Sequence, residues 1–239
     1  MTHKTFFAAI TAFVASFIFG ADVSANDGAY QVVSPDGHLS ATVVVGSDIS
    51  YTVSRDALQL IAPSQISMTL SDGIVFGQDD KVRKVRRDSR DQVWQATVYK
   101  KSDVRDHYNE MTLEFKEFSL TFRAYDDGVA YRFASKLKGD FTVMSEKAEF
   151  AFAKDWDAFI PYVKQHTKTL ETQYFNSFEN TYKEHRLSEW NKSRLAFAPL
   201  VVNADNGVKV LLTEADLLDY PGMFLYNEGD ASTLSARFA

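Results

Sequence analysis

Apolar and polar residues alternate with a period of two in several short runs of this 239-residue chain, and turn-forming residues separate these runs. In the run 111–116, Met, Leu and Phe alternate with Thr, Glu and Lys. Because successive side chains of a strand point to opposite faces of a sheet, each such run predicts a strand with one buried face. No run of any length shows the amphipathic pattern of a helix.

The turns between these runs predict which strands pair. Asp126-Asp127-Gly128 interrupts the clearest pair, and Gly128 can supply the left-handed backbone conformation that a short loop needs. The pattern predicts four hairpins, which join 39–45 to 49–53, 67–70 to 74–76, 120–124 to 129–134, and 199–202 to 208–213. Many short strands with regular turns are typical of an all-β fold, and we expect one large antiparallel β-sandwich.

Composition and charge exclude several classes of function. The net charge is -6, which argues against nucleic acid as a main partner because a phosphate backbone needs a basic surface. The one basic stretch, 81–87, is flanked by aspartates and is interpreted as a solvated strand face. The chain has no cysteine, so disulfides and thiolate zinc sites are excluded.

The first 25 residues have the three parts of a secretory signal peptide. Lys4 precedes the apolar run 6–20, and Val23-Ser24-Ala25 offers small residues where signal peptidase cleaves. We expect cleavage after Ala25, which leaves 26–239 as a single β-sandwich domain. A retained anchor is the alternative. No later stretch has the ~20 apolar residues that cross a bilayer, so we expect no membrane span after cleavage and an exported, periplasmic protein.

Two segments could carry chemistry. The segment 156–190 breaks the strand pattern and is rich in aromatic residues; such long irregular segments are functional or disordered, and the aromatic density argues against disorder. The segment 213–222 places Glu214, Asp216 and Asp219 directly after an apolar strand, where binding sites are often built. A solvated turn is the alternative reading of these acids. Phosphate-loop, G-x-S-x-G and H-E-x-x-H motifs do not occur.

Four stretches, taken together and in order, resemble glycoside hydrolase family 97. These stretches are spread over most of the chain after residue 26. The first is Ser-Pro-Asp-Gly-His-Leu at 34–39 with its continuation to 64, and the second is Val-Arg-Asp-His-Tyr-Asn-Glu at 104–110. The third is Phe-Arg-Ala-Tyr-Asp-Asp-Gly-Val-Ala-Tyr-Arg-Phe at 122–133, and the fourth is Leu-Thr-Glu-Ala-Asp-Leu at 212–217 with Tyr-Pro-Gly-Met at 220–223.

The resemblance implies a fold and separate roles for two domains. Family members begin with a β-sandwich of the galactose mutarotase type (a supersandwich), which a catalytic (β/α)8 barrel follows. The chain stops at Ala239, about where the barrel should begin, so we expect a truncated enzyme whose catalytic residues lie in the missing barrel. The sandwich is expected to contribute to the active-site rim and to a calcium site.

The resemblance also points to individual residues. It implies Glu214 as the calcium ligand, and Asn176 and Glu179 as contacts to the sugar or the ion. Trp156 and Trp190 could stack on sugar rings, and their alternative role is packing against the missing barrel.

The function expected from the resemblance is the N-terminal domain of an exported calcium-dependent α-glycoside hydrolase, of α-glucosidase or α-galactosidase type, that acts on oligosaccharides. One alternative is a non-catalytic carbohydrate-binding β-sandwich module. Another is a mutarotase-like epimerase, which would need a His and carboxylate pair that the sequence does not reveal.

Overall fold

The computed structural model describes residues 28–164, 169–229 and 232–239. The expected signal peptide at 1–25 and its cleavage site lie outside these residues. Within them, no helix is long and apolar enough to cross a bilayer.

The expected all-β fold is confirmed: the described residues form antiparallel strands with only three short 3-10 turns, η1 (Glu171–Tyr174), η2 (Leu187–Glu189) and η3 (Asp205–Gly207). The strands are β1 (Ala29–Val33), β2 (Leu39–Val45), β3 (Ile49–Arg55), β4 (Leu58–Leu70), β5 (Val75–Phe76), β6 (Lys84–Gln95), β7 (Asp103–Glu114), β8 (Phe118–Tyr125), β9 (Val129–Ser135), β10 (Val143–Ala151), β11 (Asp157–Ile160), β12 (Lys183–Arg186), β13 (Ala196–Phe197), β14 (Leu200–Asn203), β15 (Lys209–Leu212), β16 (Met223–Tyr226) and β17 (Thr233–Phe238).

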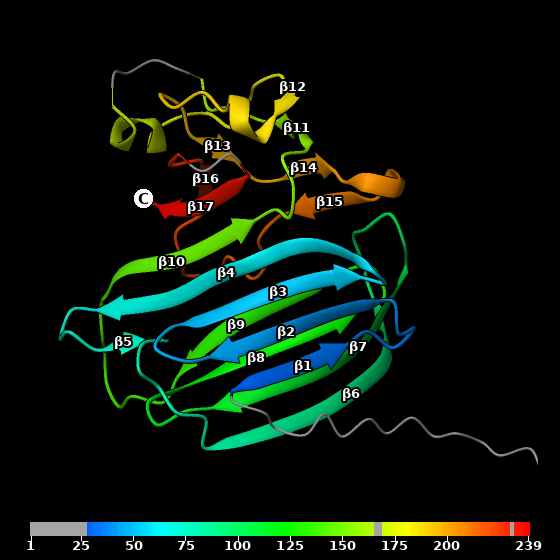
Figure 1. Cartoon of the computed structure of the whole chain (residues 1–239), viewed down its shortest axis with the longest axis vertical. Helices are drawn as coiled ribbons and strands as arrows, with labels where there is room; N and C mark the ends of the chain where they lie inside the picture. Colours follow the sequence, from blue (N-terminus) through cyan, green and yellow to red (C-terminus); the bar gives the residue numbers. More distant parts are fainter. Residues whose placement is uncertain (1–27, 165–168, 230–231) are drawn as a thin grey trace, which may run out of the picture.

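Among the described residues these strands make three sheets. The largest has the order β1-β2-β3-β4-β10-β17-β16-β13, with β5 paired to β4. A second sheet, β6-β7-β8-β9, packs against its first half to form the sandwich, and in Figure 1 β1 to β4 lie in front of it. The third sheet, β12-β11-β14-β15, lies at the opposite end of the molecule from β6.

The core of the sandwich follows directly from the period-two pattern. Every second side chain of β8 is buried, and Phe118, Leu120 and Phe122 are fully buried. Phe122 meets Tyr51 of β3 with ring centroids 5.8 Å apart, so the two sheets are joined through aromatic side chains. Burying one such side chain contributes about 1.5–3 kcal/mol to folding.

The predicted hairpins agree with the strand pairings. β2 pairs β3, β4 pairs β5, β8 pairs β9, and β14 pairs β15. One detail differs from the expectation, because Gly128 does not take a positive φ. The β8–β9 turn is instead closed by the Tyr125 N–H, which donates to the Gly128 carbonyl at 2.7 Å.

Candidate functional site

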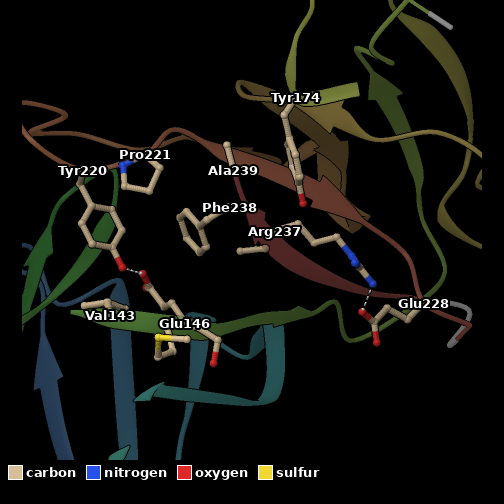
Figure 2. A pocket seen from close by; sticks show the side chains of 12 residues that line it. Val143, Glu146, Tyr174, Tyr220, Pro221, Glu228, Arg237, Phe238 and Ala239 are labelled. Atoms are coloured by element: carbon tan, nitrogen blue, oxygen red, sulfur yellow. Dashed lines mark hydrogen bonds and ion pairs between the residues drawn. The ribbon is translucent and has the colours of Figure 1, made fainter. Parts of the chain in front are cut away.

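A hollow of about 430 Å³ lies between β10, β17 and the connection from β15 to β16. Figure 2 shows its lining, in which carboxylates, a guanidinium and aromatic rings come together; they include Glu146, Tyr174, Tyr220, Glu228, Arg237 and Phe238. Arg237 donates to Glu228 at 2.9 Å on one side, and Tyr220 contacts Phe238 on the other, with ring centroids 5.7 Å apart. The hollow therefore has an ion pair on one side and a pair of aromatic rings on the other.

Glu146 is the half-buried acid of this hollow. It stands on β10, and the Tyr220 hydroxyl donates to its carboxylate at 2.6 Å (Figure 2). Burial raises the pKa of Glu146, the hydrogen bond from Tyr220 lowers it, and the negative charge of Glu214 raises it again. The last effect means that Glu146 and Glu214 are close enough for their charges to interact.

Glu214 follows β15 and is held by the start of β16. The Met223 N–H lies 3.0 Å from one of its carboxylate oxygens and 2.8 Å from the other. Burial raises the pKa of Glu214, and this backbone hydrogen bond opposes the shift. The acid predicted as a metal ligand is thus fixed in position and partly removed from water, unlike the neighbouring Asp216, which is exposed.

The segment that carries Asn176 and Glu179 packs on the same strand, β16. Its rings of Tyr174 and Phe178 lie 5.1 and 5.7 Å from the ring of Phe224, which follows Met223 directly. The Asn176 side chain donates to the Lys164 carbonyl, and Glu179 is exposed. The structure therefore brings this segment and Glu214 to the same short strand.

Trp156 and Trp190 lie apart from this group. They are only 7% and 3% exposed. The indole N–H of Trp156 donates to Asp205 at 3.0 Å, and that of Trp190 donates to the Arg194 carbonyl at 3.1 Å. Both positions favour the packing role over the stacking role, and the packing is against this domain's own core.

The most exposed rings of the aromatic segment are those of Phe175 and Phe178, which are 91% and 58% exposed. Sequence reasoning did not single them out over the buried tryptophans, because composition cannot tell which ring of an irregular segment faces water. Glu146 was also missed. A signal for it existed: Glu146 shares its strand face with Ala148 and Phe150, which pack in or against the core, so an acid occupies an inward position.

The donors at this site suit a hard cation, but they are too few to hold one. Calcium takes six to eight oxygen ligands, with carboxylates prominent among them. Glu146 and Glu214 are two such groups. Across residues 28–164, 169–229 and 232–239, however, no cluster of three or more His, Cys, Asp or Glu side chains could hold a metal ion.

Comparison with known proteins gives a consistent relationship. The family model "Glycosyl-hydrolase 97 N-terminal" matches residues 32–239. A retaining alpha-galactosidase of Bacteroides thetaiotaomicron is 43% identical over 212 residues, which cover 88% of this chain and 32% of that protein. The chain thus spans about a third of the length of this relative.

Solved structures share the fold. A glycoside hydrolase family 97 enzyme from Pseudoalteromonas sp. strain K8, in complex with acarbose, superposes with a TM-score of 0.74 at 24% identity, over 87% of this chain and 32% of that one. A beta-arabinopyranosidase superposes with a TM-score of 0.75 at 23% identity, over 88% of this chain and 35% of that one. At this identity the likeness speaks for the fold alone.

Proposed function

Since the chain belongs to glycoside hydrolase family 97 and corresponds to its N-terminal part, we propose that it is the N-terminal domain of an exported, calcium-dependent α-glycoside hydrolase. Of the two substrate types expected from the sequence, we propose α-galactosides. The site on this domain then forms part of an active-site rim, while the bond-breaking groups come from the catalytic barrel.

The observation that carries this proposal is the 43% identity to a retaining alpha-galactosidase over 88% of the chain. The family model matches residues 32–239, a range that includes the residues of the hollow and the segment 213–223. A free-standing binding module would not need to keep a carboxylate such as Glu214 half-buried beside a second acid, since burying charge costs free energy unless a partner compensates it.

Calcium is part of the proposal. Burial raises the pKa of both Glu146 and Glu214, and the charge of Glu214 raises the pKa of Glu146 further, so a divalent cation near Glu214 would lower the cost of keeping these carboxylates ionised. Glu214 is the proposed ligand, because its carboxylate is oriented by the Met223 N–H. Since no third His, Cys, Asp or Glu of the described residues joins these acids, we propose that further ligands come from the catalytic barrel. The ion would supply charge stabilisation next to the scissile bond.

Asn176 and Glu179 are the proposed contacts to the sugar or to the ion's shell. They belong to the segment that packs on β16, the strand whose Met223 N–H binds Glu214, and the Glu179 side chain is exposed. The exposed rings of Phe175 and Phe178, on either side of Asn176, give this segment the apolar surface on which pyranose rings stack. Oligosaccharides are therefore the proposed partners, with export to the periplasm by the signal peptide at 1–25.

The proposal is tested by assaying two proteins on p-nitrophenyl α-galactoside and p-nitrophenyl α-glucoside. One is the product of the complete gene, and the other is the 239-residue chain. The complete protein should hydrolyse the α-galactoside faster than the α-glucoside, and the chain alone should hydrolyse neither. Turnover by the chain alone would show that its catalytic groups had been placed in the wrong domain, and a complete protein inactive on both substrates would contradict the function.

A further inference from the structure

The strand β6 (Lys84–Gln95) is a long exposed edge of the sandwich. Among the described residues it pairs only with β7, so the backbone groups that point away from β7 have no partner strand along its length. Its side chains are mostly exposed, and Val93 and Trp94 are 58% and 60% exposed. In Figure 1, β6 runs along the lower margin of the molecule, with no other labelled strand below it. An edge of this length is a template for pairing with another strand.

The hydrogen bonds fix which residues face that open side. Ala96 N–H donates to the Ser102 carbonyl in the β6–β7 ladder, and directions alternate along an antiparallel strand. The N–H groups of 85, 87, 89, 91 and 93 therefore point away from β7. Ser89 confirms this alternation, because its N–H bonds to its own neighbour Asp88 at 2.9 Å and not to β7.

Charges on an edge strand normally repel a second copy, but on β6 they are self-complementary around Ser89. If two copies of β6 pair antiparallel with Ser89 opposite Ser89, then Asp88 faces Arg90, and Arg87 faces Asp91. Further out, Val85 faces Val93, and Lys84 faces Trp94, which adds apolar and cation–π contact. Every opposed pair in this register is favourable or neutral.

The alternative registers are unfavourable. A shift of two residues one way places Arg90 opposite Arg90, and a shift the other way places Asp88 opposite Asp88. A shift of one residue would turn the paired N–H groups away from each other. Of the registers within two residues of one another, the charge order of the strand therefore favours the one centred on Ser89.

We infer that β6 is a self-association edge, at which a second copy of this chain adds its own β6 antiparallel across Ser89 and joins the two β6–β9 sheets into one continuous sheet. The Asp91 carboxylate, which already binds Arg105 at 2.7 and 2.8 Å, then lies between Arg105 and the second copy's Arg87. No residue of the hollow around Glu146 takes part, so this inference does not depend on the proposed function.

Charge reversal tests the inference. The mass of the full chain is measured by sedimentation equilibrium over a concentration series, and we expect a monomer–dimer equilibrium. Asp88→Arg places an arginine opposite Arg90 of the second copy, and Arg90→Asp places an aspartate opposite Asp88. Each like-charged pair occurs twice per dimer, so either variant should weaken the dimer by at least about tenfold. The double variant D88R/R90D restores opposite charges in the same register and should restore the dimer.

A cross-link gives a second readout that does not depend on charge. The chain has no cysteine, and Cα atoms of a hydrogen-bonded antiparallel pair lie about 5.5 Å apart, within the range for a disulfide. Ser89→Cys should therefore form a disulfide dimer under mild oxidation, whereas Ser71→Cys, an exposed turn residue, should not. A chain that stays monomeric throughout the series would overturn the inference. So would a dimer that both single reversals leave intact, or one that the double variant fails to restore.

Discussion

The body of the sandwich and the end that holds Glu146 and Glu214 differ in which side chains they bury and which they expose. In β2, β3 and β8, apolar side chains point inward and polar ones outward. At the other end, two carboxylates are partly buried while the rings of Phe175 and Phe178 face water. The first arrangement lowers the free energy of folding, and the second raises it, since charge loses its hydration and apolar surface stays wet.

The difference teaches where to look for function. A domain keeps a region with buried carboxylates and exposed rings, here called the inverted end, only if something other than its own stability requires it. A sugar, an ion or a further domain would each supply a binding partner for these groups. Substitutions at the two ends test this difference.

The largest effect is expected in the sandwich body. Phe122→Ala removes a fully buried ring that contacts Tyr51 and Tyr131. The transfer term and the cavity together should lower the free energy of unfolding by about 3–5 kcal/mol. Urea denaturation measures this loss. A loss below about 1 kcal/mol would mean that the two sheets do not depend on this ring.

A smaller loss is expected where the aromatic segment joins the core. Trp156→Phe keeps most of the buried ring but removes the N–H that donates to Asp205 at 3.0 Å. The lost hydrogen bond to a carboxylate should lower the free energy of unfolding by about 1–3 kcal/mol. If Trp156 instead binds sugar, its substitution should leave stability unchanged and weaken ligand binding, which isothermal titration with a galacto-oligosaccharide would detect.

At the inverted end, removing a charge should stabilise the protein. The folded pKa of Glu146 is raised from 4.5 by burial, so its contribution to stability is present below pH 4.5 and is lost as the pH rises through the folded pKa. Glu146→Gln stays neutral and keeps an oxygen for the Tyr220 hydroxyl. The variant should therefore gain stability over the natural chain as the pH rises above 4.5.

Urea unfolding at a series of pH values checks this sign, and Glu179→Gln, at an exposed acid, serves as the control. A variant that is less stable than the natural chain at pH 7 would show that the charge of Glu146 is compensated within the domain.

The smallest effect on folding is expected at Phe175, which is 91% exposed. Phe175→Ala should change the free energy of unfolding by less than about 0.5 kcal/mol, as surface substitutions do. The same substitution in the complete protein should raise KM for an oligosaccharide if the ring stacks on sugar. A substantial loss of stability would place Phe175 in the sandwich's own packing.

The sequence predicted the sandwich body well and the inverted end only in part. Alternation in 111–116 and 129–134 reports which face is buried, so β7 to β9 could be found from residue order alone. The residue pattern alone did not separate Glu214 from Asp216 and Asp219, and only the family resemblance pointed to it. Glu146 is about seventy positions away from Glu214 in the chain, and no local pattern links the two acids. The exposure of Phe175 and the burial of Trp156 also depend on contacts between distant segments.

The most direct test of the central claim is a calcium titration of activity in the complete protein, with the natural sequence and with Glu214→Gln. Asp216→Asn is the matched control, since it removes an exposed carboxylate two residues away. If the acidic end of this sandwich helps to hold a divalent ion for chemistry done by another domain, the Glu214 variant should need at least about tenfold more calcium for half-maximal activity, because one charged oxygen ligand is lost. The Asp216 variant should titrate like the natural protein. An unchanged calcium requirement in Glu214→Gln would contradict the claim.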